Sequence, residues 1–313
     1  MKLLSIVFSF RNEEKNIPEL IDRIIKILSK LNGWKYELIF VNDDSDDNSE
    51  KILLEKQKIC PIKIINMSRK FGTGPCVLAG LKFSKGDAII YMDSDLQDPP
   101  EIIPDLINKF ENGAEVVHTK RSKRLGENRI KMFLTKIAYI AINKTSGIPL
   151  EINAGDFKLL SKKVVEHINS LAEFNPYIRG LSVWIGFKQE YIEYVREARF
   201  SGKSKFTNLF SGPLSQFIRG ITSYSTSPLY LGIIVGFLAI LFSFLLTIYA
   251  LYAKFTGIDV PGTSGILIAI SFFSGAILST VGIIGIYIAR IYEQTQGRPR
   301  YIIKNIIDSK SKQ

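Results

Sequence analysis

Short apolar runs alternate with stretches of helical character along the first 120 residues of the chain. Five of these runs have the length and composition of buried strands, namely Leu3–Phe10, Glu37–Val41, Ile62–Asn66, Ala88–Met92 and Glu115–His118. Helices are expected between them over 17–31, 51–58 and 74–83, and again from residue 100. This alternation predicts an α/β domain with a mostly parallel sheet.

Two long uncharged stretches near the C-terminal end differ from everything before them. Leu229–Ala253 and Gly265–Ala289 consist mostly of Leu, Ile, Val, Phe, Gly and Ala, and about 20 such residues span a bilayer. Soluble helices of that length usually carry a polar face, so two transmembrane helices are predicted. The loop Lys254–Ser264 has one basic residue, whereas six follow Ala289. This asymmetry predicts a plasma (inner) membrane protein with both termini in the cytoplasm.

Apolar positions at helical spacing continue between the α/β pattern and the first apolar stretch. They occupy one face of 130–141 and one face of 206–221. Both segments have the pattern of helices that lie in a membrane interface, and core packing is the alternative for the first. The predicted organisation is a cytoplasmic domain over 1–200, an interfacial amphipathic linker over 201–228, a two-helix transmembrane region over 229–292 and a basic cytoplasmic tail over 293–313.

The net charge of +11 has two dense clusters, Lys120–Arg124 and Arg196–Lys205. In a protein held at a membrane, such clusters suit anionic headgroups or a phosphorylated substrate, which we favour over nucleic acid. The two cysteines, Cys60 and Cys76, have no metal-ligand spacing and indicate no disulfide framework. The charge therefore points to a membrane and a phosphorylated substrate as partners.

Two carboxylates one residue apart, Asp93 and Asp95, follow the apolar run that ends at Met92. Carboxylate oxygens suit Mg²⁺ or Mn²⁺, and Mg²⁺ is often held by one or two carboxylates together with substrate phosphates. An acidic turn after a strand is the plain alternative. Because ligands gather at the carboxyl ends of parallel strands, a metal–diphosphate site is favoured. Polar segments follow three other predicted strands, at Ser9–Glu14, Asn42–Asp47 and Thr119–Arg124.

Six motifs occur in order along the chain: Asn12-Glu13-Glu14, Val41-Asn42-Asp43-x-Ser45, Asp93-x-Asp95-Leu96-Gln97-Asp98-Pro99-Pro100-Glu101, Gly155-Asp156-Phe157, Arg179-Gly180-Leu181-x-x-Trp184-x-Gly186-Phe187 and Arg199-x-x-Gly202-x-Ser204-Lys205. As an ordered set, this resembles the polyisoprenyl-phosphate glycosyltransferases of glycosyltransferase family 2. Within that family it is similar to the bactoprenol-phosphate glucosyltransferase and dolichol-phosphate mannose synthase group, whose bacterial members carry two C-terminal spans.

The resemblance implies that residues 1–200 form a Rossmann-like GT-A glycosyltransferase domain. It implies a nucleotide-sugar donor, with UDP favoured, and a polyprenyl-phosphate acceptor such as undecaprenyl phosphate at the cytoplasmic membrane face. It also implies Mg²⁺ or Mn²⁺ as cofactor and a homo-oligomer such as a tetramer. In family terms, the donor-binding positions are Ser9, Glu13, Val41, Asp43, Asp93, Gln97 and Arg121.

Further roles follow from the same resemblance. Asp93 and Asp95 are the implied metal ligands, and Arg121, Arg199 and Lys205 match basic positions that contact phosphates. Three positions depart from the family pattern. Ser9 and Arg11 stand where Pro and Tyr are common, and Asp44 stands where Gly is usual. The change at Asp44 bears on loop geometry, because Gly tolerates a positive φ more readily than Asp does.

Direct displacement at the anomeric carbon, with inversion of configuration, is the mechanism that the resemblance implies. Arg199 and Lys205, together with the metal held by Asp93 and Asp95, would stabilise the leaving diphosphate. A phosphomonoester acceptor, with a second pKa of about 6, needs no strong base. Asp156 is the best candidate for a general base or an acceptor-positioning group, and a structural carboxylate, bonded to a loop or paired with an Arg, is an equal alternative for it.

Two other functions fit parts of the pattern. The same domain could act on a growing glycan or on diacylglycerol, but processive polysaccharide synthases usually have a Gln-x-x-Arg-Trp motif and more spans, which this sequence lacks. A non-catalytic nucleotide-sugar-binding membrane subunit is the other alternative, and the complete set of charged motif residues argues against it. The sequence does not identify the sugar, and a UDP-hexose such as UDP-glucose is the first expectation.

Overall fold

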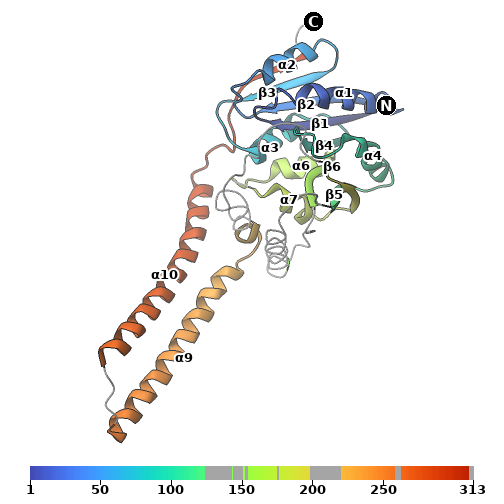
Figure 1. Cartoon of the computed structure of the whole chain (residues 1–313). Helices are drawn as coiled ribbons and strands as arrows, with labels where there is room; N and C mark the ends of the chain where they lie inside the picture. The colour runs from blue at the N-terminus through green and yellow to red at the C-terminus, as the bar shows by residue number, and fades with distance from the viewer. Residues whose placement is uncertain are drawn as a thin grey trace.

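The structure, a computed structural model, describes residues 1–123, 143, 151, 154–174, 176–197, 220–257 and 262–309. An α/β domain lies at one end, and a hairpin of two long helices leads away from it (Figure 1). The predicted α/β domain followed by two apolar C-terminal helices is therefore confirmed.

One sheet of eight strands organises the α/β domain. The strands are β1 (Lys2–Phe10), β2 (Trp34–Asn42), β3 (Ile62–Met67), β4 (Ala88–Asp93), β5 (Val116–Lys123), β6 (Ala154–Ser161), β7 (Gln189–Val195) and β8 (Ile303–Asp308). Their order in the sheet is β7-β5-β6-β4-β1-β2-β3-β8. Only β6 and β8 run against the other described strands, so the sheet is mostly parallel, as predicted.

Helices cover both faces of this sheet. They are α1 (Ile17–Leu28), α2 (Ser49–Lys56), α3 (Thr73–Phe83), α4 (Ile103–Glu111), α6 (Lys162–Ser170) and α7 (Ile178–Trp184), with a 3₁₀ turn, η1, at Pro100–Ile102. On one face, α1, α2 and α4 pack over residues such as Phe8 and Phe40, whose ring centroids lie 4.6 Å apart. On the other face, α3, α6 and α7 pack over Val7 and Val41.

The central strand β1 lies between β2 and β4 and pairs with both. Its residues from Leu4 to Phe10 are all buried, because helices cover both faces, and such a strand appears in sequence as a continuous apolar run. The register pairs Ser9 with Val41 of β2 on one side and with Asp93 of β4 on the other. The carboxyl ends of these three strands therefore lie side by side.

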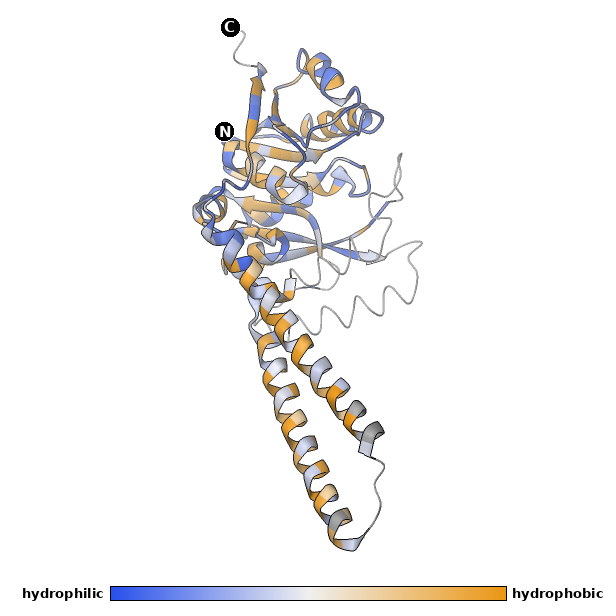
Figure 2. Ribbon diagram, turned by 90° about the vertical axis from the view of Figure 1, so that its left-hand side faces the viewer, coloured by the Kyte–Doolittle hydropathy of each residue, from blue (hydrophilic) through white to orange (hydrophobic). Residues whose placement is uncertain are grey.

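The two long helices are α9 (Ser227–Thr256) and α10 (Gly262–Thr295), and they pack against each other. Of the candidate spans within them, Ser227–Ala253 is 11% buried and Ala269–Thr295 is 0% buried. Their apolar residues are thus exposed, unlike those of a soluble core helix, and Figure 2 shows the hydrophobic colouring along both. Both helices are long enough and apolar enough to cross a membrane.

After α10, the chain returns to the α/β domain. Residues Ile303–Asp308 form β8, which pairs antiparallel with the edge strand β3 (Figure 1). Asn66 Nδ2 of β3 donates to Asn305 Oδ1 at 2.8 Å. The prediction of a basic tail over 293–313 misses this strand, because it is only six residues long and its isoleucines do not alternate with the polar residues.

Two predicted helices fall largely outside the described residues. The segment 130–141 lies wholly outside them, and of 206–221 only residues 220 and 221 are described, at the start of a helical turn over 220–224. Most of the linker predicted over 201–228 lies outside them too. The amphipathic interfacial helices therefore stay predictions.

Candidate active site

The ends of β1, β2 and β4 bring Ser9, Val41 and Asp93 side by side. The hydroxyl of Ser94 donates to the carbonyl oxygen of Ser9 at 3.2 Å, which ties the loop after β4 to β1. Such a meeting of strand ends is the usual place for a ligand in a mostly parallel sheet.

The loops after β1 and β2 form one scaffold. The backbone N–H of Asn12 donates to Ser45 Oγ at 3.1 Å, and that of Asp46 donates to Asn12 Oδ1 at 3.0 Å. Glu13 is buried within this scaffold, where its Oε2 accepts a hydrogen bond from Asn16 Nδ2 at 2.5 Å. Glu13 therefore helps to hold the loop that borders the site.

The buried carboxylate of Asp43 fixes a third loop. It accepts hydrogen bonds from the backbone N–H of Phe71 at 2.6 Å and of Gly72 at 3.0 Å. Arg11 Nη1 donates to the carbonyl oxygen of Asp43 at 3.3 Å. The next residue, Asp44, has a φ of 59°, so this loop keeps a left-handed residue at the position where the family pattern has glycine. Asp43 is a predicted donor-binding residue. If its carboxylate contacts the nucleobase of the donor, its oxygens have to bind the nucleobase and these two backbone amides together.

Four carboxylates converge beyond the end of β4. Asp93 ends the strand, Asp95 and Asp98 follow in the loop, and Asp156 approaches from β6. Burial raises the pKa of Asp93 to about 7, and the negative charges of Asp156, Asp95 and Asp98 add to this effect. A divalent cation would relieve this crowding, because it favours the charged form of its carboxylate ligands.

Asp93 and Asp95 fit the predicted metal site by their donor chemistry. The backbone N–H of Gln97 donates to Asp95 Oδ1 at 3.2 Å, and Leu96 between them has a φ of 59°, so the loop turns sharply here. Among the described residues, no group of three or more His, Cys, Asp and Glu side chains could hold a metal ion. Two carboxylates leave coordination positions for water and substrate phosphates, as in many magnesium sites.

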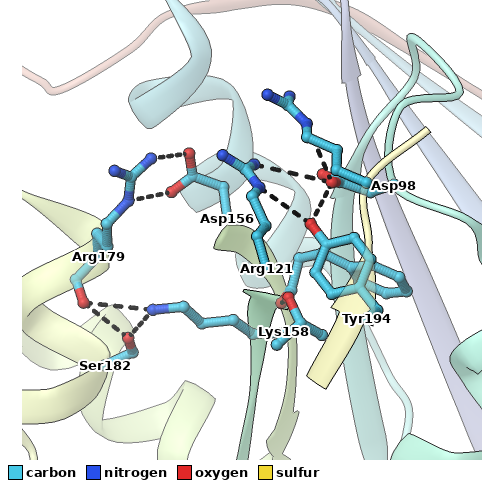
Figure 3. A network of polar contacts seen from close by, with 10 residues as sticks. Asp98, Arg121, Asp156, Lys158, Arg179, Ser182 and Tyr194 are labelled. Atoms are coloured by element: carbon cyan, nitrogen blue, oxygen red, sulfur yellow. Dashed lines mark hydrogen bonds and ion pairs between the residues drawn. The ribbon is translucent and has the colours of Figure 1, made fainter. Parts of the chain in front are cut away.

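Asp98 is a buried carboxylate that holds two guanidinium groups (Figure 3). Its Oδ1 lies 3.7 Å from Arg121 Nη2 and 3.5 Å from Arg196 Nε. The same oxygen accepts a hydrogen bond from the hydroxyl of Tyr194, to which Arg121 Nε also donates at 3.1 Å. One carboxylate therefore sets the positions of both arginines, and the charge of Arg196 also acts on Asp93.

The carboxylate of Asp156 is engaged by Arg179 (Figure 3). Arg179 Nε donates to Asp156 Oδ1 at 3.0 Å, and Arg179 Nη2 donates to Oδ2. Burial acts to raise the pKa of Asp156, but the charge and hydrogen bonds of Arg179 outweigh it and lower the pKa to about 2. Such a carboxylate is a weak general base at neutral pH. The geometry favours the alternative of a carboxylate paired with an Arg.

Lys158 lies two residues further along β6 and is fully buried. Its Nζ donates to Ser182 Oγ at 2.6 Å and to the carbonyl oxygen of Arg179 at 3.3 Å (Figure 3). Burial lowers the pKa of Lys158 to about 7, although Asp156 acts in the opposite direction. Asp156 and Lys158 thus hold the side chain and the backbone of one residue, Arg179.

The start of the basic cluster Arg196–Lys205 is hydrogen-bonded to the loop that contains Asp95 and Gln97. The backbone N–H of Glu197 donates to the carbonyl oxygen of Gln97 at 3.0 Å. Arg23 pairs with Glu197 at 3.4 Å and with Glu101 at 2.5 Å. Arg199 and Lys205 themselves lie outside the described residues, but the chain enters their loop from this edge of the site.

Five residues at this site are absent from the sequence prediction of site residues: Asp98, Lys158, Arg179, Tyr194 and Arg196. Asp98 and Arg179 lie within the quoted motifs, and Arg196 lies within a basic cluster, so each had a signal in the sequence. Lys158 stands out only as a lysine inside an apolar stretch. Tyr194 carries no signal, because its partners are more than 70 residues away.

Comparison with known families identifies the family of the α/β domain. Glycosyl transferase family 2 matches residues 5–168, from β1 into α6. The chain belongs to glycosyl transferase family 2. Its predicted enzyme class, a glycosyltransferase, and the resemblance drawn from its motifs are thereby confirmed.

Relatives match this glycosyltransferase over nearly its whole length. The uncharacterized glycosyltransferase YkcC of Bacillus subtilis is 40% identical over 96% of this chain and 93% of its own. The bactoprenol glucosyl transferase of Shigella phage SfV is 38% identical over 96% of this chain and 98% of its own. A crystal structure of glucosyl-3-phosphoglycerate synthase from Mycobacterium tuberculosis, with UDP, Mn²⁺ and glucosyl-3-phosphoglycerate, is 19% identical over 71% of this chain and 78% of that chain, with a TM-score of 0.49.

Proposed function

We propose that this glycosyltransferase moves a hexose from a nucleotide-sugar, with UDP-glucose as the first expectation, to a polyprenyl phosphate at the cytoplasmic face of the membrane. The observation that carries the proposal is the match to a bactoprenol glucosyl transferase over 96% of the chain, through the site and both apolar helices. A lipid acceptor is consistent with a site on a domain that is joined to a hairpin able to cross a membrane.

Asp93 and Asp95 are the proposed ligands of Mg²⁺ or Mn²⁺, which would offset the charge of the donor diphosphate. Arg121 and Arg196, held by Asp98, are the described cations best placed to stabilise that diphosphate as it leaves. Arg199 and Lys205 are proposed for the same task from the loop after Glu197. The remaining proposed donor contacts are Ser9, Glu13, Val41, Asp43 and Gln97.

A phosphate oxygen of the acceptor is the proposed nucleophile. Phosphomonoesters lose their second proton with a pKa of about 6, so this oxygen is already negative at neutral pH. It forms a bond to the anomeric carbon as the bond from that carbon to the diphosphate breaks, which inverts the configuration. Asp156 is proposed to orient Arg179 for the acceptor phosphate, because a guanidinium held by a carboxylate presents its remaining face in a fixed direction.

The placement in the cell follows from the charge around the two helices. Basic residues after α10 favour a plasma-membrane protein with both termini and the α/β domain in the cytoplasm. A homo-oligomer such as a tetramer is retained from the family resemblance, and light scattering of the detergent-solubilised protein would measure its mass.

The direct test is incubation of the purified full-length protein with undecaprenyl phosphate, Mg²⁺ and a panel of UDP- and GDP-sugars. Mass spectrometry should find a lipid-linked hexose phosphate, and NMR should find a β-linked sugar made from an α-linked donor. An α-linked product would refute inversion. Transfer to a glycan or to diacylglycerol instead would establish the second acceptor class, and nucleotide-sugar binding without transfer to any acceptor would establish the non-catalytic subunit.

A further inference from the structure

Helix α7 is fixed to the catalytic sheet by two charged side chains of β6. Asp156 bonds the guanidinium of Arg179 through both carboxylate oxygens. Lys158 donates to the carbonyl oxygen of Arg179 and to the hydroxyl of Ser182, one turn further along the helix. The position of the Arg179 guanidinium therefore follows the position of α7.

The same helix is in contact with an aromatic residue next to the membrane hairpin. Tyr224 ends the helical turn 220–224, three residues before α9 begins at Ser227. A β-carbon added at Gly180 would stand 2.9 Å from Cζ of Tyr224 and closer still to its Cε2, and it would also stand 2.9 Å from Cδ1 of Tyr177. The ring therefore lies directly on the backbone of α7. Its hydroxyl donates to the carbonyl oxygen of Tyr177, which precedes α7, at 3.0 Å.

The segment that carries Tyr224 is also bound to the second membrane helix. The hydroxyl of Tyr287 in α10 donates to the carbonyl oxygen of Ser225 at 2.7 Å, and Arg290 Nη1 donates to Ser223 Oγ at 3.0 Å. In Figure 1, α7 lies on the side of the α/β domain that faces the hairpin. Both membrane helices thus meet α7 through one short segment.

We propose that Tyr224 is a positioning residue that transmits the placement of the membrane hairpin to Arg179 through Gly180 and α7. The inference rests on the proposed lipid-phosphate acceptor. An acceptor anchored in the membrane presents its phosphate at a height set by the bilayer, so the group that receives it has to be set relative to the membrane helices. A misplacement of about 1 Å at a reacting group can cost about a hundredfold in rate.

This arrangement separates the acceptor from the donor. Arg179 stands on α7, which Tyr224 touches, whereas Asp93 ends β4 and Asp43 directly follows β2. Loss of the Tyr224 contact should therefore impair use of the lipid acceptor and leave UDP affinity as it is. A general folding defect would lower both.

The first test is a double-mutant cycle on the full-length protein in lipid nanodiscs. Gly180→Ala, which pushes α7 against the ring, should lower kcat/KM for undecaprenyl phosphate by about tenfold to a hundredfold. In the Tyr224→Ala background only the Tyr177 ring still opposes the added methyl group, so the loss of kcat/KM caused by Gly180→Ala should be at least several-fold smaller. Equal effects of Gly180→Ala in both backgrounds would overturn the coupling, and so would a loss of UDP affinity parallel to the loss of transfer.

Two matched controls accompany the cycle. Tyr224→Phe keeps the ring on Gly180 and loses only the hydrogen bond to Tyr177, so its kcat/KM should stay within about threefold of wild type. Tyr230→Ala removes a tyrosine of α9 that is 61% exposed, and should have as little effect. A loss in Tyr224→Phe as large as in Tyr224→Ala would show that the ring contact is not what positions α7.

Hydrogen exchange separates this inference from the proposed function, because it requires no acceptor. Tyr224→Ala should speed exchange in peptides that cover Ile178–Trp184 by about tenfold and leave peptides from α1 unchanged. Unchanged exchange over α7 would overturn the coupling, whatever the protein does with undecaprenyl phosphate. If the exchange difference is present but the wild type transfers no sugar to that lipid, the coupling stands and the proposed acceptor falls.

Discussion

Replacement of Asp98 by asparagine removes one buried charge beside the metal motif and little else. The amide keeps the shape of the side chain and an oxygen for the hydroxyl of Tyr194, but Arg121 and Arg196 lose the carboxylate that they share. The side chain of Asp98 is 0% exposed, and those of Arg121 and Arg196 are 11% and 23% exposed. Water therefore cannot fully replace the lost charge.

The expected size of the effect follows from the ion-pair distances. At 3.7 and 3.5 Å and an effective dielectric constant of about 20, each pair attracts by roughly 4–5 kcal/mol before desolvation. Removal of one partner from a buried ion pair costs about 3–5 kcal/mol. Because both arginines keep some solvent contact, we expect Asp98→Asn to lower the free energy of unfolding by about 3 kcal/mol. For a domain of about 200 residues, this lowers the unfolding midpoint by roughly 6–12 °C.

Ligand binding distinguishes a structural role of Asp98 from one at the diphosphate. UDP with Mn²⁺ should stabilise Asp98→Asn more than it stabilises the wild type, because the phosphates supply negative charge to the two guanidinium groups. Thermal unfolding of the detergent-solubilised protein, followed by intrinsic fluorescence with and without ligand, measures both effects. Asp105→Asn, at an exposed position of α4, is the matched control and should change stability by less than about 0.5 kcal/mol.

Two results would refute this reasoning. A midpoint for Asp98→Asn equal to that of the wild type would show that the shared carboxylate does not stabilise the arginines. A lowered midpoint with a ligand-induced shift no larger than that of the wild type would show that Arg121 and Arg196 do not face the diphosphate.

Four further outcomes are expected. Asp95→Ala, or removal of divalent metal with EDTA, should abolish metal-dependent UDP binding in calorimetry, and binding that survives both would contradict the metal assignment. Asp156→Asn should lower turnover by about a hundredfold because Arg179 loses its orienting group, and turnover within a few-fold of wild type with the fold intact would remove Asp156 from the mechanism. The pKa of Lys158 is about 7 in the folded protein, below its usual 10.5. The unfolded state therefore binds more protons between these values, and stability should rise from pH 7.5 to about 9 in thermal unfolding. Lys158→Met should flatten that rise, and an equal slope would show that another group causes it. Deletion of 297–313 removes β8 from the edge of β3 and should cost about 2 kcal/mol, or roughly 4–8 °C in the midpoint, and an unchanged midpoint would show that β8 adds no stability.

The strands that sequence predicts and those that it misses differ in their surroundings. β1, β3 and β4 are buried along most of their length, as β2 is from Leu38 onwards, and they appear as largely apolar runs. β7 and β8 are edge strands with exposed positions, and β6 carries Asp156 and Lys158 among its apolar residues. Their pairing partners are also distant in sequence, as for β8, which pairs with β3 more than 200 residues before it. The pattern of apolar and polar residues within a short segment cannot reveal contacts with residues so far away in the sequence.

The candidate site divides in the same way. Asp93 and Asp95 are recognisable because their chemistry is contained in three consecutive positions after one apolar run. The role of Asp156 was open in the sequence, since a carboxylate becomes a base or an ion-pair partner according to what surrounds it. Only the fold brings Arg179 of α7 to the carboxylate oxygens of Asp156, and this contact lowers the pKa of Asp156. The roles of Arg199 and Lys205 stay predictions, because both lie outside the described residues.

By itself, the sequence determined the α/β class, the two apolar helices, the order of the family motifs and the carboxylate pair at the end of β4. These features are local, because each depends on the spacing or composition of neighbouring residues. The tertiary structure alone decided that Asp98 pairs with Arg121 and Arg196, that β8 forms one edge of the sheet, and that Tyr224 lies on Gly180, the residue after Arg179. Each of these contacts joins residues that are between 20 and more than 200 positions apart, and only the packing of the folded chain brings them within reach.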